Sequence, residues 1–245
     1  MRVLHIDSSI DGERSVSRRL TAAIVARLKE SNPNLTLTYR DVATNPVPQL
    51  SEAMWFARMV ALYEAGILPG EVGEVIVTAL RGGARIDPSA RRDLAASDAA
   101  LEEFLAADVV VLAAPMYNFA IPSQLKAWID TLAVPGKTFR YSAEKGGVEG
   151  LAGGKWLILA STRGGIYTPG AHEAFRDHQE TYVAEFFGFM GVTDITVVRA
   201  EGVNLGPEFR RAALESALAI AATLDAGKVG CTGNLPPAER SALGG

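Results

Sequence analysis

The residues best suited to chemistry form three short groups, and each group directly follows an apolar segment that is typical of a buried strand. Serine hydroxyls near the start of the chain are suited to phosphate, and bulky aromatic and amide side chains near its middle are suited to lining a ligand. The third group contains two successive glycines, which allow a flat or anionic ligand to approach the backbone closely. The groups are Ser8 to Ser17, Pro115 to Phe119 and Ser161 to Gly165.

The serine group lies between a short apolar strand, Arg2 to Asp7, and the start of a helix. The N–H groups in the first turn of a helix are free and carry a partial positive charge, so serines beside them are suited to binding a phosphate. Ser15 or Ser17 could equally cap the helix and bind nothing, which is the commoner role of serine there. The residues alone leave both interpretations open.

The middle group ends a strand and begins a ligand-sized turn. Four consecutive apolar residues, Val109 to Leu112, are typical of a strand that is covered on both faces of a parallel sheet. Pro115 ends this pattern, and the following residues, Met116 to Phe119, are too bulky and too polar for a simple connector. Apolar residues at helical spacing after Pro122 then predict a helix. The glycine pair of the third group is a weaker signal, because two glycines also form ordinary turns.

The elements that must position these groups alternate between strands and helices. This alternation predicts an α/β fold, a flavodoxin-like doubly wound parallel sheet of five strands with helices on both faces. The order 2-1-3-4-5 fits best, and it makes the first, third and fourth strands neighbours. The three groups follow these strands, so we expect them to meet in the crevice where such sheets bind ligands. The expected strands are residues 2–7, 35–42, 109–112, 155–160 and 194–200.

The remaining segments complete a single domain, 1–245. Irregular residues 68–93, with a short strand expected at Val75 to Ala79, belong to an insertion around 55–93, and a tail follows at 228–245. The glycines and charges of residues 137–154 indicate a surface loop, and helices are expected at 171–190 and 209–226.

Composition favours a small-molecule partner. The formal net charge is only -4, so the overall balance indicates neither nucleic acid nor an anionic membrane surface as a partner. The apolar stretches are too short for a membrane span, and the N-terminus lacks the pattern of a secretory signal. The one cysteine, Cys231, can form no internal disulfide, which fits a cytoplasmic location.

Several catalytic motifs are absent from the sequence. It contains no G-x-G-x-x-G after the first strand, no P-loop lysine motif and no G-x-S-x-G elbow. The histidines, His5, His172 and His178, do not have the spacing of metal ligands, so no metal site is expected. A pocket without acid, base or metal indicates that a bound cofactor carries the reaction and that no side chain is itself catalytic.

Taken together, the motifs PMYNF, IPSQLKAWID, KTFRY and TRGGIY and the early serines resemble the FMN-dependent NADH-azoreductases, also called FMN-dependent NADH:quinone oxidoreductases. The resemblance extends from about Arg2 to Asp225 and implies a flavodoxin-like fold with bound FMN. It also implies that NADH or NADPH donates electrons and that quinones or azo compounds accept them by two-electron ping-pong hydride transfer. A homodimer with active sites between its subunits is implied as well.

The resemblance assigns roles to individual residues. It implies that the FMN phosphate is bound by Ser9, Ser15, Val16 and Ser17. The flavin ring is expected between Met116, Tyr117, Asn118 and Phe119 on one edge and Thr162, Arg163, Gly164 and Gly165 on the other. Thr162 replaces a serine that is common in the family. Tyr141, Phe189 and Tyr167 are expected to shape the substrate pocket.

Two other functions remain open from the sequence. A one-electron flavodoxin-like carrier would share the fold, although such carriers usually present a strongly acidic face and this chain is nearly balanced in charge. A ligand-binding module without a cofactor would contain no flavin at all.

Overall fold

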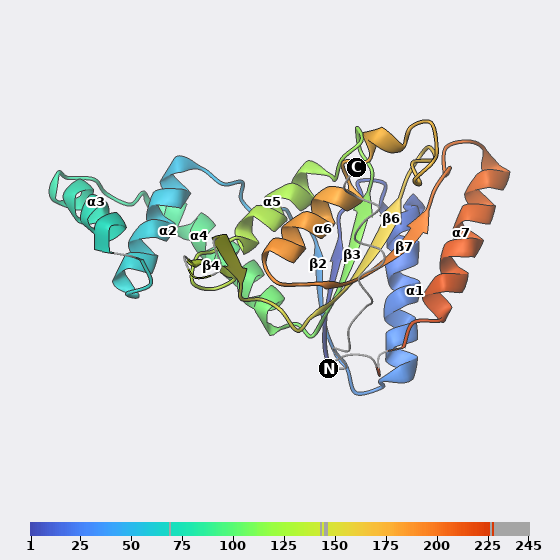
Figure 1. Ribbon diagram of the computed structural model, residues 1–245, viewed down its shortest axis with the longest axis horizontal. Helices are drawn as coiled ribbons and strands as arrows, with labels where there is room; N and C mark the ends of the chain where they lie inside the picture. Colours follow the sequence, from blue (N-terminus) through green and yellow to red (C-terminus); the bar gives the residue numbers. More distant parts are fainter. Residues whose placement is uncertain (69, 143, 145–146, 226, 228–245) are drawn as a thin grey trace.

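A parallel sheet forms the centre of the protein (Figure 1). The computed structural model describes residues 1–68, 70–142, 144, 147–225 and 227. Its main sheet has five strands, all parallel, in the order β2-β1-β3-β6-β7. These strands are β1 (Arg2–Asp7), β2 (Thr36–Asp41), β3 (Val109–Pro115), β6 (Trp156–Thr162) and β7 (Asp194–Ala200). The α/β class and the parallel sheet are therefore confirmed.

The predicted strand numbering, 2-1-3-4-5, needs correction because the sequence analysis missed two strands. Residues 137–154, expected to be a surface loop, contain the antiparallel hairpin of β4 (Phe139–Ser142) and β5 (Gly147–Gly150). Arg140 and Glu149 pair across this hairpin, with Nε and Oε2 2.6 Å apart. The charges that suggested a loop thus join the two strands to each other.

The two faces of the sheet are buried by different helices, because successive residues of a strand point to opposite sides. Val110 and Leu112 of β3 pack in one core with α4 (Pro88–Ala106), α5 (Ser123–Leu132) and α6 (Glu180–Phe189). Val109 and Val111 pack in a second core with α1 (Val16–Ser31) and α7 (Pro207–Ala222). Figure 1 shows these two helix layers on either side of the strands. All seven residues of β3 are buried, as its apolar run predicts.

Helices α2 (Glu52–Glu64) and α3 (Gly70–Arg81) project beyond the sheet together with the start of α4 (Figure 1). The short strand expected at Val75 to Ala79 is wrong, because these residues lie within α3, where Ile76 is buried. Close packing explains a glycine inside this helix: a Cβ atom at Gly73 would lie 2.6 Å from the ring of Tyr63 on α2. Helical packing thus overrides the β-branched residues that suggested a strand.

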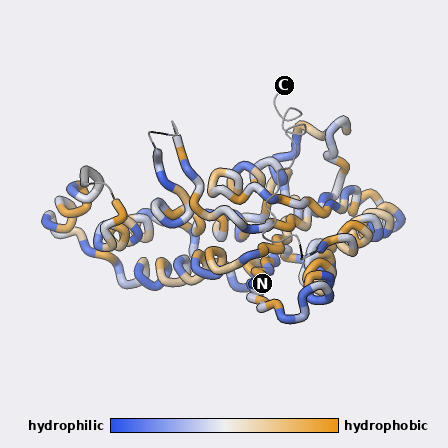
Figure 2. The backbone as a smooth tube through the Cα atoms, turned by 60° about the horizontal axis from the view of Figure 1, so that its bottom comes forward, coloured by the Kyte–Doolittle hydropathy of each residue, from blue (hydrophilic) through white to orange (hydrophobic). Residues whose placement is uncertain are grey.

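Other helix boundaries also differ from the expected ones. The helix expected at 171–190 is divided into a short 3-10 helix, η2 (Ala174–Arg176), and α6; a second 3-10 helix, η1 (Gly12–Arg14), precedes α1. The division of 171–190 occurs at Asp177, whose carboxylate accepts hydrogen bonds from the N–H groups of Gln179 and Glu180 at the start of α6. The last helix, α7, ends at Ala222 rather than at residue 226. Figure 2 shows hydrophobic and hydrophilic residues alternating along the helices, as expected for helices with one buried side.

No helix in the described part of the chain is long and apolar enough to cross a membrane. Cys231 and the tail at 228–245 lie outside the described residues.

A close backbone contact holds the β4–β5 hairpin against the body of the protein. A Cβ atom at Gly150 would clash with the backbone of Met190 and Gly191, whereas Gly147 on the same strand has open space around it. We expect Gly150→Ala to lower the free energy of unfolding by about 1–3 kcal/mol, because the backbone has to shift. Gly147→Ala should change it by less than about 0.5 kcal/mol. Urea unfolding of both variants measures the difference, and equal values would contradict this contact.

Candidate functional site

The three groups singled out in the sequence meet at the carboxyl edge of the sheet. Strand β3 lies between β1 and β6, so the segments that follow these strands are neighbours. The N–H of Met116 donates to the carbonyl of Thr162 at 2.8 Å. The hydroxyl of Tyr117 accepts a hydrogen bond from the N–H of Ile10 at 3.1 Å and lies 3.2 Å from Oγ of Ser9. Tyr117 thus connects the middle group to the serine group.

The serine group surrounds the start of α1. Ser15 caps this helix, because its Oγ accepts a hydrogen bond from the N–H of Arg18 at 3.3 Å. Oγ of Ser17 lies 3.0 Å from Oγ of Ser15, and both side chains are buried. The N–H groups of Val16 and Ser17 belong to the first turn, where N–H groups have no partner within the helix. Helix capping and anion binding are therefore compatible here, and the donors present are those that a phosphate needs.

The turn after β3 has a strained backbone. Asn118 and Phe119 have φ angles of 50° and 70°, and Tyr117 and Ala120 on either side of them pair as an isolated antiparallel bridge. Positive φ at both central residues is the geometry of a type I′ turn, which asparagine tolerates and phenylalanine does not favour. Such strain costs about 1–3 kcal/mol per residue and is found most often at ligand sites. The N–H of His178 donates to the carbonyl of Phe119 at 3.1 Å and supports the turn.

The loop after β6 depends on its two glycines. A Cβ atom at Gly164 would lie 2.7 Å from Nδ2 of Asn204, and one at Gly165 would lie 3.2 Å from the ring of Tyr167. The N–H groups of Asn204 and Gly202 donate to the carbonyls of Gly164 and Gly165, at 3.1 and 2.8 Å. Thr162 is buried at the end of the strand. The segment that follows β7 thus supports the glycine loop through these two hydrogen bonds.

The side chain of Arg163 turns away from this edge into the protein. It is 1% exposed and forms ion pairs with Asp177, Glu180 and Glu201, at 2.7, 2.7 and 3.1 Å. Its Nε also donates to Oε1 of Gln179 at 2.9 Å. The side chain of Arg163 is therefore directed away from the predicted ligand site, and its backbone N–H and carbonyl are hydrogen-bonded to Ala200 and Val203, at 2.9 and 3.1 Å.

Glu201 is a structural part of the site that the sequence analysis missed. One of its oxygens accepts hydrogen bonds from Arg163 and from the N–H of Tyr167, the latter at 2.8 Å, and the other accepts from the hydroxyl of Thr168. Glu180 likewise accepts two hydrogen bonds from Arg199, and these bonds raise the pKa of that guanidinium. No spacing in the sequence links these residues, because they come from the ends of different elements.

The three expected pocket residues do not lie together. Tyr167 packs edge-on against Phe119, with ring centroids 6.4 Å apart. Tyr141 and Phe189 instead belong to an aromatic cluster around Phe139, whose ring lies 5.8 and 4.8 Å from theirs. In Figure 1 the β4 strand of this cluster lies beside α6, away from the carboxyl ends of the central strands.

A cavity of about 900 Å³ adjoins the strained turn and continues between α5 and α6. Its walls include Tyr117 and Asn118 near the turn and Lys126 and Tyr182 on the helices. The ammonium group of Lys126 lies 5.9 Å from the ring centre of Tyr182. Burial, with the nearby charge of Asp130, raises the pKa of the Tyr182 hydroxyl to about 12, so this hydroxyl stays protonated at physiological pH.

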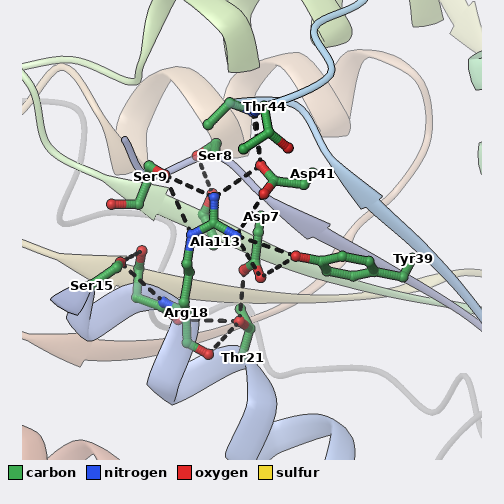
Figure 3. Close-up of polar contacts among 12 residues, drawn as sticks. Asp7, Ser8, Ser9, Ser15, Arg18, Thr21, Tyr39, Asp41, Thr44 and Ala113 are labelled. Atoms are coloured by element: carbon green, nitrogen blue, oxygen red, sulfur yellow. Dashed lines mark hydrogen bonds and ion pairs between the residues drawn. The ribbon is translucent and has the colours of Figure 1, made fainter. Parts of the chain in front are cut away.

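A network of charged and hydroxyl groups lies behind the serine group (Figure 3). The guanidinium of Arg18 pairs with Asp41 through two contacts, at 2.8 and 2.9 Å, and the carboxylate of Asp7 accepts from the hydroxyls of Thr21 and Tyr39 at 2.8 and 3.1 Å. Burial alone would raise the pKa of Asp7, but His5 and these two hydroxyls outweigh it, and the pKa lies below its ordinary 3.8. Burial and Asp7 raise the pKa of Tyr39 to about 12.

The described residues contain no group of three or more His, Cys, Asp or Glu side chains that could hold a metal ion.

The protein resembles known proteins over most of its length. A family described by its flavodoxin-like fold matches residues 1–224. An FMN-dependent NADH:quinone oxidoreductase of Methylocella silvestris is 49% identical over 217 residues, which cover 89% of this chain and 95% of that protein. An enzyme of the same name from Rhizobium meliloti is 52% identical over 217 residues, 89% of this chain and 93% of that protein. The crystal structure of a Bacillus anthracis azoreductase has a TM-score of 0.72 at 30% identity, covering 91% of this chain and 100% of that one.

The buried position of Arg163 predicts a large effect on stability. Arg163→Met leaves its three carboxylate partners without this cation, and we expect the free energy of unfolding to fall by about 3–5 kcal/mol. Arg211→Met is the control, because Arg211 forms only an exposed pair with Glu215 at 3.9 Å and should matter by less than about 0.5 kcal/mol. Urea unfolding measures both variants. Similar small losses would show that the Arg163 network does not hold the loop.

The lowered pKa of Asp7 predicts a pH-dependent stability. A carboxylate whose pKa is lower in the folded state than in the unfolded state stabilises the folded state. This stabilisation is complete when the pH is above the pKa of the unfolded state, and it is lost as the pH falls through the pKa of the folded state. We expect Asp7→Asn to lower the free energy of unfolding by about 1–3 kcal/mol at pH 7, with a smaller difference below the ordinary pKa of 3.8. Asp11→Asn is the control, because the side chain of Asp11 makes no capping hydrogen bond. A difference from wild type that does not change with pH would contradict this role of Asp7.

Proposed function

The chain belongs to the family with a flavodoxin-like fold and, within it, to the FMN-dependent NADH:quinone oxidoreductases; from this premise we propose that it binds FMN and uses NADH or NADPH to reduce quinones and aromatic azo compounds. The observation that carries the proposal is the meeting of the serine group, the strained turn and the glycine loop at one edge of the sheet. The chemistry that FMN supplies when bound is two-electron transfer.

The donors at the carboxyl edge fit the parts of FMN. Hydroxyls of Ser9, Ser15 and Ser17, with the N–H groups of the first turn of α1, would hold the phosphate. The turn at Met116 to Phe119 and the loop at Thr162 to Gly165 would hold the two edges of the flavin ring. This assignment follows the chemistry of the donors and the position of the two loops, which the hydrogen bond from Met116 to Thr162 makes neighbours.

The polypeptide would contribute orientation and electrostatics. The N–H groups of Gly164 and Gly165 would donate to the flavin and favour its negatively charged reduced form. A flat acceptor would enter the cavity beside Tyr117 and Asn118, whose dimensions suit an aromatic compound. The nicotinamide and the acceptor would use the same slot in turn, so each would be positioned by the same walls.

A homodimer would give Tyr141 and Phe189 a role in the pocket. In one chain they lie in the cluster around Phe139, apart from the strained turn, and the side chain of Tyr141 is 78% exposed. We propose that a second copy of the chain brings these rings to the pocket and that the dimer works in the cytoplasm. We also propose that residues 1–245 form one domain, in which residues 55–93 are an insertion and residues 228–245 are a tail.

Absorption spectroscopy tests the cofactor and the reaction together. We expect the purified protein, supplied with FMN, to show a bound-flavin spectrum that NADH bleaches in one two-electron step without oxygen, and a quinone to restore it. A protein that binds no FMN, or bound FMN that neither NADH nor NADPH bleaches, would overturn the proposal. A stable semiquinone would favour a one-electron carrier instead.

The strained turn provides a matched pair of variants. Asn118→Val places a β-branched residue at φ 50°, so we expect it to distort the turn and weaken FMN binding about tenfold or more. Asn118→Gly preserves the backbone geometry and removes only the side chain, so it should weaken binding less. Fluorescence titration with FMN measures both. Equal losses would show that the side chain, and not the turn geometry, is what the site needs.

A further inference from the structure

Arg18 has an unusual place beside the serine group. Its Nε and Nη2 both donate to the carbonyl oxygen of Ser9, at 3.3 and 2.9 Å. The same guanidinium pairs with Asp41 and donates to the hydroxyl of Tyr39 at 3.2 Å. In Figure 3 the guanidinium lies between the Ser9 carbonyl and the side chains of Asp41 and Tyr39. Its side chain is only 16% exposed, so all these contacts are largely shielded from water.

The peptide between Ser9 and Ile10 is therefore fixed from two sides. Arg18 binds its carbonyl, and the hydroxyl of Tyr117 accepts a hydrogen bond from its N–H at 3.1 Å. A peptide group is planar, so fixing both ends fixes its orientation and that of the adjoining Ser9 side chain. Oγ of Ser9 is in turn held by Tyr117 and by the N–H of Asp11, at 3.2 and 3.3 Å.

The backbone of Arg18 serves the same region. Its N–H donates to Oγ of Ser15, the cap of α1, at 3.3 Å. One residue thus holds Ser9 through its side chain and Ser15 through its main chain. The charge of the guanidinium is offset by Asp41 and by Asp7, whose oxygen lies 3.6 Å from Nη1. Because its charge and its donors are already engaged, Arg18 is suited to positioning and poorly suited to binding an anion directly.

We infer that Arg18 is a positioning residue for the phosphate of the cofactor: it orients the Ser9–Ile10 peptide and the Ser15 cap so that the serine group can receive a phosphate ester. This inference rests on the proposed function. It assigns to Arg18, Asp41 and Tyr39 different tasks: Arg18 holds the loop, and the other two hold Arg18.

Comparison of FMN with riboflavin tests this role, because the two ligands differ only in the phosphate. For wild type we expect FMN to bind far more tightly than riboflavin. Arg18→Gln removes the cation and its paired contacts to Ser9, so FMN binding should weaken by about 10- to 100-fold, while riboflavin binding stays unchanged. The ratio of the two dissociation constants, measured by fluorescence titration, is the readout, and a merely structural role would not change it.

Two controls separate this role from general damage. Arg19→Gln changes the exposed neighbour on the same helix and should leave both constants unchanged. Tyr39→Phe removes a hydroxyl from the side of the guanidinium away from Ser9, so it should lower the urea midpoint but keep the ratio. If Arg18→Gln does not fold, Arg18→Lys supplies the comparison, since lysine keeps the charge but cannot reach Ser9, Asp41 and Tyr39 together.

The outcomes distinguish this inference from the proposed function. Wild type that binds neither FMN nor riboflavin would overturn the proposed function. Wild type that prefers FMN, together with an Arg18 variant that keeps the same preference or weakens both ligands equally, would overturn the inference alone. The inference would also be overturned if Tyr39→Phe reduced the preference for FMN over riboflavin as much as the Arg18 variant does. The conformation of the loop after β1 would then depend on the whole network and not on Arg18.

Discussion

Parallel pairing of β3 between β1 and β6 is the constraint on which the rest of the structure depends. It brings the carboxyl ends of three strands to one edge, and each strand is followed there by a polar loop. Because β3 is buried on both faces, its register is fixed by two separate cores, one with α4, α5 and α6 and one with α1 and α7. The contacts between loops, such as that of Met116 with Thr162, follow directly from this register.

Two arginines, Arg163 fully buried and Arg18 partly buried, stabilise the loops at this edge in the same way. Arg18 holds the loop after β1, and Arg163 anchors the loop after β6 through residues from the ends of α6 and β7. Removing a charge from water is costly, and a buried ion pair adds little stability over a well-packed apolar contact. Such pairs do fix geometry, because a guanidinium requires several acceptors in one plane. Both arginines connect loop backbone to carboxylates from distant parts of the chain.

The strained turn lies between these two anchored loops. Its positive φ angles at Asn118 and Phe119 are maintained by the bridge between Tyr117 and Ala120 and by the hydrogen bond from His178. Tyr117 also reaches the serine group, so the turn and the loop after β1 support each other. The site therefore has a preorganised backbone, which reduces the conformational entropy lost when a ligand binds.

The sequence by itself determined the five strands of the main sheet, the α/β class and the three groups of residues that meet at its carboxyl edge, because apolar periodicity and turn chemistry act over a few neighbouring residues. The tertiary structure alone decided where Arg163 points, since its partners at Asp177, Glu180 and Glu201 have no sequence spacing that reveals them. It also decided that residues 137–154 contain the β4–β5 hairpin, which packs through the close approach of Gly150 to Gly191. Contacts between residues far apart in the chain depend on how packed elements meet, and local patterns do not encode that geometry.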